Sequence, residues 1–330
     1  MGGSIGPYAF TLLVFFFTLS FHVLDLPAQE TVKIAYPSTS YSTMPIVVAR
    51  REGFFSQEGL IGQLIQIRPN IGITALVNGE VDFATTQGSV VRAAARGIPI
   101  KSVAIIADRP VYFLVARPAF NSVASLSAKT KTVIGVNSLG GSVHMITKEI
   151  LVRHGLNPDK DVAIIVSGDN QTSLQAVQLG RIDATLIPIP WQTQAKKLGL
   201  KVLSYAGDLV QLPLGGLGTT ERLIQKKPEL VKKVIRATLK GTAFIRDKRN
   251  KERVLEAMTQ WFGIAHDVAN DSYEQMILAY PINGATSTEA LKKDLDIAQQ
   301  LGGIPAGVPL SRVVDFQLLR EVQKELGLPN

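Results

Sequence analysis

Five short polar loops follow apolar segments that the sequence pattern predicts as buried strands. Their hydroxyl, amide and glycine residues suit the binding of small polar molecules through hydrogen bonds. In an open parallel α/β sheet, ligands bind beyond the carboxyl ends of the strands, where the following helices also begin. We therefore expect the loops to line one ligand-binding cleft. They comprise residues 37–45, 85–89, 137–142, 167–170 and 188–191.

The loop of residues 137–142 has the clearest binding pattern. Gly140 and Gly141 allow the backbone to approach a ligand closely, and Ser138 and Ser142 add hydroxyls. The helix expected to follow would present free N–H groups and a positive dipole end. This combination suits a carboxylate, sulfonate or phosphate group. A tight turn that ends in a helix N-cap explains the same residues equally well.

Each remaining candidate also has a structural explanation. The Gln-Gly-Ser segment of residues 87–89 faces the expected cleft from the other half of the chain, or it caps a helix. Tyr41 and Trp191 offer rings for stacking on a ligand, although packing explains such rings more often. Asp169 would bind an amine on the ligand, or it caps a helix without any ligand.

No arrangement of residues in the sequence indicates catalysis. It has no P-loop, no GxGxxG fingerprint and no GxSxG elbow. Cysteine is absent, which excludes disulfides, thiolate metal sites and cysteine nucleophiles. The four histidines lie far apart and never form an HExxH-like pair. We therefore expect a binding site without metal or cofactor.

The elements that must position these loops repeat along the chain. Residues 75–84 (ALVNGEVDFA) recur as residues 176–185 (AVQLGRIDAT), at an offset of 101 positions. The same offset brings residues 31–37 onto residues 132–138. Each copy alternates short strands with helices, which predicts a parallel α/β sheet. Two copies predict two such sheets, one in each lobe.

Matched residues of the repeat have predicted structural roles. Gly79 and Gly180 each follow an apolar helical run and are expected to end a helix. Asp82 and Asp183 occupy equivalent strand positions, so we assign them to structure rather than to ligand binding.

Two segments are expected to connect the lobes. The apolar, β-branched run of residues 110–117 would carry the chain across, and residues 212–219 would bring it back. Glycines in the return segment would give a hinge its backbone freedom. These are Gly215, Gly216 and Gly218. From Pro228 to Leu326 the pattern is helical, and these helices are expected to pack on the first lobe.

Charge and the N-terminus bear on location. The net charge is +8, but Lys and Arg are spread along the chain and no nucleic-acid motif occurs. The apolar run of residues 9–24 resembles a secretory leader with cleavage after Ala28. An uncleaved anchor is the competing interpretation, since no basic residue precedes the run. Because no cysteine follows it, a lipoprotein anchor is excluded.

Several motifs in order resemble one family. These are residues 45–60 (PIVVARREGFFSQEGL), 75–84, 97–100 (GIPI), 155–161 (GLNPDKD) and 180–184. They resemble the nitrate/sulfonate/taurine-type solute-binding proteins of ABC transporters, which share a fold with thiamine-pyrimidine binding proteins. The resemblance implies a two-lobed, α/β, type II periplasmic-binding-protein fold with two mostly parallel sheets, a two-strand hinge and C-terminal helices on lobe one.

The resemblance also implies domain limits, partners and site residues. Residues 1–28 would be a signal peptide, residues 30–112 plus 215–330 lobe one, and residues 113–214 lobe two. The protein would be a periplasmic monomer that passes a small ligand, anionic in character, to a membrane permease and binds no nucleic acid. The resemblance places the family's ligand contacts in the same loops, and we add the loop residue Ser138 to them. The candidate ligand-binding residues are Ser40, Tyr41, Gln87, Gly88, Ser89, Ser138, Gly141, Ser142, Asp169, Pro190 and Trp191.

Two other functions remain open at this point. Some proteins of this fold are enzymes, either chorismate dehydratase-like or pyrimidine synthases. Eukaryotic pyrimidine synthases use a cysteine-rich iron segment, which this chain cannot supply, and the dehydratase-like enzymes are cytoplasmic and would carry no leader. The other alternative is a ligand-sensing module, although no signalling segment accompanies it.

Overall fold

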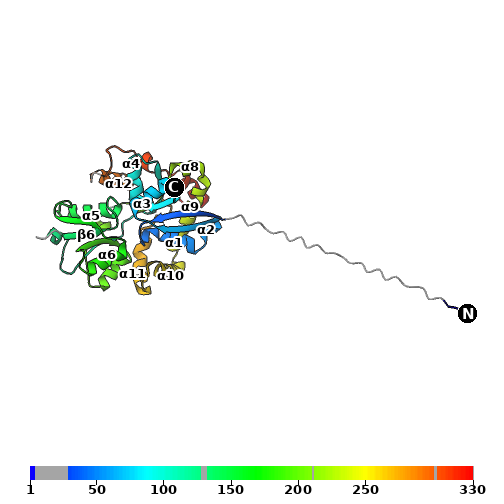
Figure 1. Cartoon of the computed structure of the whole chain (residues 1–330), viewed down its shortest axis with the longest axis horizontal. Coiled ribbons are helices and arrows are strands. Elements are labelled where there is room, and N and C mark those ends of the chain that lie inside the picture. Colours follow the sequence, from blue (N-terminus) through cyan, green and yellow to red (C-terminus); the bar gives the residue numbers. More distant parts are fainter. Residues whose placement is uncertain (4–28, 128–131, 210–211, 301–302, 330) are drawn as a thin grey trace.

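The computed structural model describes residues 1–3, 29–127, 132–209, 212–300 and 303–329 (Figure 1). The predicted leader therefore lies almost wholly outside the described residues. Within them, no helix is both long enough and apolar enough to span a bilayer.

The first sheet has five strands in the order β2-β1-β3-β10-β4. Strand β1 pairs in parallel with β2 and β3, whereas β10 runs antiparallel between β3 and β4. Four of the strands come from the first third of the chain and the fifth from beyond residue 210. Their bounds are β1 Glu30–Tyr36, β2 Leu60–Gln66, β3 Phe83–Thr86, β4 Ile100–Ala107 and β10 Gly215–Thr220.

The second sheet repeats this arrangement, in the order β7-β6-β8-β5-β9. Strands β7, β6 and β8 are parallel, and β5 runs antiparallel to both of its neighbours. The two sheets confirm the predicted two-lobed α/β fold. Their strands are β5 Tyr112–Ala116, β6 Thr132–Val136, β7 Val162–Val166, β8 Ala184–Pro188 and β9 Lys201–Tyr205.

Helices cover the sheets (Figure 1). Those of the first lobe are α1 Met44–Arg51, α2 Phe54–Gln57, α3 Pro69–Asn78 and α4 Gln87–Ala95, and those of the second are α5 Ser142–Arg153, α6 Asn170–Gln178 and α7 Trp191–Lys197. The C-terminal helices are α8 Glu221–Lys226, α9 Pro228–Arg246, α10 Lys251–Phe262, α11 His266–Ile277, α12 Thr288–Gln300, α13 Leu310–Val313 and α14 Gln317–Glu325.

The matched residues of the repeat have the predicted structural roles. Gly79 and Gly180 follow α3 and α6 with φ of 77° and 69°, a left-handed conformation that favours glycine. A carboxylate oxygen of Asp82 accepts the backbone N–H of Lys33 at 2.8 Å. Asp183 accepts that of Val133, also at 2.8 Å. Asp82 thus links the start of β3 to β1, and Asp183 links the start of β8 to β6.

The first connection between the lobes is shorter than expected. Tyr112 already begins β5 of the second sheet, so residues 108–111 make the first crossing. The predicted glycine hinge is wrong, because Gly215, Gly216 and Gly218 lie within β10. A Cβ on Gly216 would lie 2.1 Å from Oε1 of Gln87, and one on Gly218 would lie 2.4 Å from Val90. These glycines allow β10 to pack against α4, which is a different use of a missing side chain.

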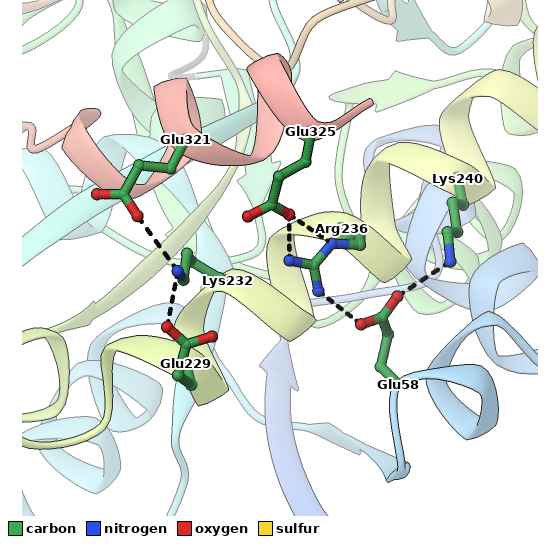
Figure 2. Close-up of polar contacts among 7 residues, drawn as sticks. All are labelled: Glu58, Glu229, Lys232, Arg236, Lys240, Glu321 and Glu325. Carbon is green, nitrogen blue, oxygen red and sulfur yellow. Dashed lines mark hydrogen bonds and ion pairs between the residues drawn. The ribbon is translucent and has the colours of Figure 1, made fainter. Parts of the chain in front are cut away.

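The C-terminal helices contact more than the first lobe. Helix α9 packs on α1, α2 and α14, whereas α11 also contacts α7 of the second lobe. Along the outer face of α9, Lys232, Arg236 and Lys240 pair with carboxylates of two neighbouring segments and of α9 itself (Figure 2). Glu58, for example, lies 2.6 Å from Arg236 and 3.0 Å from Lys240. The network ties α14 and the segment after α2 to α9.

Candidate functional site

A small chamber lies where the two lobes meet. Its volume is about 30 Å³, which is room for one or two water molecules. None of its lining side chains carries a charge near neutral pH, and burial raises the pKa of Tyr112 to about 12. Both lobes contribute to it, together with Leu214 just before β10. The lining residues are Pro37, Ser42, Pro69, Thr85, Thr86, Ser89, Tyr112, Asn137, Ser142, Val143 and Leu214.

Two helices begin at this chamber, one from each lobe. Thr86 precedes α4 and Gly141 precedes α5, and neither helix has a side-chain cap. Their first N–H groups are therefore free of side-chain partners, and the positive ends of two helix dipoles lie at the chamber. Oγ1 of Thr86 and Oδ1 of Asn137 are buried without a hydrogen-bond partner among the described residues. The free N–H groups at the two helix starts suit a ligand with acceptor oxygens.

The lobes are in close contact at Gly88. A Cβ on this residue would lie 2.2 Å from Oγ of Ser142 in the other lobe. Only glycine at position 88 fits this degree of closure without displacing a neighbour. The predicted Gly88 and Ser142 are thus brought together across the cleft.

One flank of the chamber contains a charged residue that the sequence analysis missed. A compartment of about 190 Å³ is lined by Ser89, Arg92, Ser138 and Gly140, among others. The Arg92 residue is only 4% exposed, although it carries a guanidinium. The sequence contained a signal for this residue, because Arg92 is an arginine inside the apolar helical run of residues 90–95. Arginine is almost never fully buried unless it is paired, so a buried arginine there indicates a specific role.

The loop of residues 137–142 is held by a histidine. The N–H of Gly140, whose φ is 74°, donates to Nδ1 of His144 at 2.9 Å. Accepting this bond requires a neutral imidazole, and burial lowers the pKa of His144, so the two observations agree. The loop is thereby fixed around Ser138, which is buried.

The opposite flank is wider and contains Asp169. This space of about 420 Å³ is lined by residues of both lobes, including Arg68 and Asp169. A side-chain oxygen of Asp169 accepts the N–H of Thr172 at 2.8 Å and so caps α6. Asp169 therefore has the structural role proposed as its alternative, while it also lines the cleft.

A backbone carbonyl joins the lobes at the first-strand loop. The carbonyl oxygen of Thr39 accepts Nδ2 of Asn170 at 2.7 Å and Nε1 of Trp191 at 3.1 Å. The Trp191 ring is 4% exposed and packs edge-on against Phe262. In this closed arrangement the indole forms an interlobe contact, and the preceding Pro190 is buried beside it.

Three further predicted residues are engaged with protein groups. The Tyr41 hydroxyl donates to the carbonyl of Arg109 at 2.8 Å and accepts the N–H of Val111 at 2.9 Å, so it holds the first crossing segment. Ser40 accepts the N–H of Ser42 as a cap. Oε1 of Gln87 accepts the hydroxyl of Ser102 at 2.6 Å, which turns this side chain toward β4. None of the three lines the chamber or its two flanks.

Among the described residues, no group of three or more His, Asp or Glu side chains could hold a metal ion. The polar groups around the chamber are suited to hydrogen bonding with an organic molecule or a small anion.

Comparisons with known proteins place the chain in a family. The riboflavin-binding protein RibY of Chloroflexus aurantiacus is 28% identical over 233 residues, which cover 65% of this chain and 62% of RibY. A 4-amino-5-hydroxymethyl-2-methylpyrimidine phosphate synthase of Legionella pneumophila is 27% identical over 240 residues, covering 68% and 71%.

The periplasmic nitrate-binding protein NrtA of Synechocystis shares the fold, with a TM-score of 0.76 at 17% identity over 91% of this chain and 89% of NrtA. The NMT1/THI5-like family matches residues 40–251, more than half of the sequence. The chain therefore belongs to the NMT1/THI5-like family.

Proposed function

We propose that this protein is an extracytoplasmic solute-binding protein. It captures a small molecule with an anionic group between its lobes and delivers it to an ABC importer. The observation that carries the proposal is the uncharged chamber at the lobe boundary, where two uncapped helices begin. The fold shared with a nitrate-binding protein and the similarity to a riboflavin-binding protein support this function.

The chamber size implies that capture requires motion. A cavity of about 30 Å³ cannot accept a molecule of several heavy atoms while the lobes are closed. Opening would break the two hydrogen bonds on the carbonyl of Thr39 and separate Gly88 from Ser142. Ligand entry, closure and release to a permease would then follow from the same movement.

The chamber lining favours binding over catalysis. Its one titratable side chain, Tyr112, has a pKa of about 12 and would stay neutral. A general acid or base works best with a pKa near the operating pH, and none of the lining residues meets this requirement. The similarity to a pyrimidine phosphate synthase makes an enzyme the second candidate, and its test is whether a bound compound is altered.

A thermal-shift panel tests the proposal directly. The purified protein is heated with nitrate, sulfonates, aliphatic and aromatic carboxylates, pyrimidines and riboflavin. A solute at 100 times its Kd adds about 2.7 kcal/mol to the folded state, which raises the melting temperature measurably. Recovery of the compound unchanged, together with loss of its uptake in cells that lack the protein, is the expected result. A compound consumed in the assay would favour the enzyme instead.

A further inference from the structure

The guanidinium of Arg92 is buried and unsatisfied. Its residue is 4% exposed, and neither Nε nor Nη2 has a hydrogen-bond partner among the described residues. Burial of a cation with unpartnered donors is costly, which makes these two nitrogens candidates for contact with a ligand. The residue lies in the second turn of α4, one turn beyond the Gly88 contact.

The guanidinium reaches the lobe boundary. The position that a Cβ on Gly88 would occupy is 2.7 Å from Nη2 and 3.0 Å from Nη1 of Arg92, and 2.2 Å from Oγ of Ser142. Arg92 also lines the 190 Å³ compartment, together with Ser89 and Ser138. A cation, three hydroxyls and the start of α5 therefore surround one small space between the lobes.

A carboxylate from elsewhere in the chain balances this charge. Asp294 of α12 is 5% exposed and lies close enough to influence Arg92 electrostatically. Its Oδ2 also lacks a hydrogen-bond partner among the described residues. The two side chains share a buried region without satisfying each other's hydrogen bonds, so the donors of Arg92 remain available to a ligand.

We propose that Arg92 reads the charge of the ligand. The ligand's oxyanion group, a carboxylate or a sulfonate, binds between Ser89 and Ser138 on the guanidinium, and Asp294 balances that guanidinium when the cleft is empty. This inference rests on the proposed function, because it assumes that the cleft captures a solute. Beyond that function, Arg92 is the residue that selects the solute, and the space between Ser89 and Ser138 is where the selected group binds.

The inference leads to a pH dependence of binding. Burial raises the pKa of Asp294 to about 6, although Arg92 opposes the shift. As the pH falls through about 6, Asp294 becomes neutral and anion affinity rises, since Arg92 is then uncompensated. The other charged or titratable groups nearby are Arg96 on α4, His144 and Lys148 on α5, and Asp159, which acts on His144. Protonation of His144 would add positive charge and also break its bond with the N–H of Gly140, so His144→Gln separates its contribution from that of Asp294.

Matched anionic and neutral solutes test the inference by titration calorimetry at pH 7.5. Methanesulfonate is compared with methanesulfonamide, and acetate with acetamide. We expect the wild type to prefer the anion, and Arg92→Gln to weaken anion binding about 10- to 100-fold with little effect on the neutral partner. Arg92→Lys should recover part of the loss. Arg181→Gln, which removes an exposed charge at the opposite end of β8, should change nothing.

A second variant covers the case in which Arg92→Gln fails to fold. The double variant Arg92→Gln/Asp294→Asn removes both buried charges, and it should lose the anion preference while still binding neutral solutes. In Asp294→Asn alone, anion affinity should no longer rise as the pH falls through about 6, apart from any contribution of His144. Equal binding of anion and amide by the wild type, or undiminished anion binding by the double variant, overturns the inference and leaves the proposed function standing. Failure to bind any solute in the wider panel would overturn the proposed function itself.

Discussion

Two cationic regions of the first lobe differ in how their charges are satisfied. On the outer face of α9, each cation of the network meets one or two carboxylates near solvent (Figure 2). On the cleft face, Arg92 is buried and two of its nitrogens have no partner among the described residues. The paired charges on the outer face of α9 join helices to one another, whereas the guanidinium of Arg92 is left available to a ligand. The difference teaches that pairing, more than the number of charges, separates a structural surface from a binding surface.

The largest effect on stability is expected from the buried carboxylate. The pKa of Asp294 is about 6 in the folded protein and near 3.8 when unfolded, so the folded state binds more protons between these values. The unfolding free energy due to this group therefore falls as the pH rises from about 4 to 6, by at most about 3 kcal/mol. Urea denaturation across this range should show a flatter profile for Asp294→Asn.

The exposed Asp296, on the same helix, supplies the control. Asp296→Asn should keep the wild-type pH profile. If Asp294→Asn instead lost stability in parallel with the wild type from pH 4 to 6, the charge of Asp294 would not be the cause.

The next largest effect is expected at Gly88, where the first lobe contacts Ser142 of the second. Gly88→Val should weaken binding of the solute identified in the thermal-shift panel about 100-fold, since its side chain would occupy the space between Ser142 and Arg92. The melting temperature without solute should change little, because the lobes can remain apart and the tip of the flexible Arg92 side chain can shift. Calorimetry measures the first quantity and thermal denaturation the second.

Gly72→Ala is the matched glycine variant, because a Cβ there has its nearest neighbour at 3.8 Å, an ordinary contact. It should bind the solute normally. Wild-type affinity in Gly88→Val would show that closure at this point is not needed for binding.

A smaller effect is expected from the Thr39 contact. Trp191→Phe removes one of the two interlobe hydrogen bonds on that carbonyl and retains most of the packing on Phe262. We expect about a fivefold faster release of solute in stopped-flow measurements, which corresponds to one ordinary hydrogen bond. Phe262→Leu, which keeps the hydrogen bond, distinguishes its contribution from that of packing. An unchanged release rate in Trp191→Phe would assign the contact no role in closure.

The smallest effect is expected on the outer face. Glu58 is 10% exposed in its side chain and contacts both Arg236 and Lys240. Glu58→Gln should lower the unfolding free energy by about 0.5–1 kcal/mol, less at high salt, with unchanged solute affinity. Glu229→Gln, at a 72% exposed side chain, should have almost no effect. A change in affinity in either variant would erase the distinction between the two regions.

The fold was largely predictable because its signals are local. Glycines that end helices and the matched aspartates Asp82 and Asp183 repeat at one offset, and the structure gives both pairs their predicted roles. The glycines of β10 were misassigned because their need comes from α4, which the sequence separates from them by more than a hundred positions. A glycine in the sequence indicates either backbone flexibility or close packing, and the residues that surround it in the fold decide between the two.

The site was less predictable because its contacts also join residues that are far apart in the sequence. The loops around Gly88 and Ser142 follow from strand order, and the structure brings them together. The role of Arg92 depends on which face of α4 meets the other lobe and on Asp294, which lies far along the chain. The hydroxyl of Tyr41 and the indole of Trp191 were expected at a ligand, whereas backbone groups of the crossing segment and of Thr39 engage them here.

The position of β10 also sets an order in time for folding. The second sheet has all its strands once Tyr205 has been synthesised, whereas β4 has no strand partner in its own sheet until Gly215–Thr220 emerges. The first lobe is therefore begun first and completed last. The apolar strand β4 has no paired strand while all strands of the second sheet are synthesised. Non-local strand pairing of this kind is slow and leaves edges exposed to other chains. A nascent chain that stalls between the two sheets would present β4 as its most vulnerable segment.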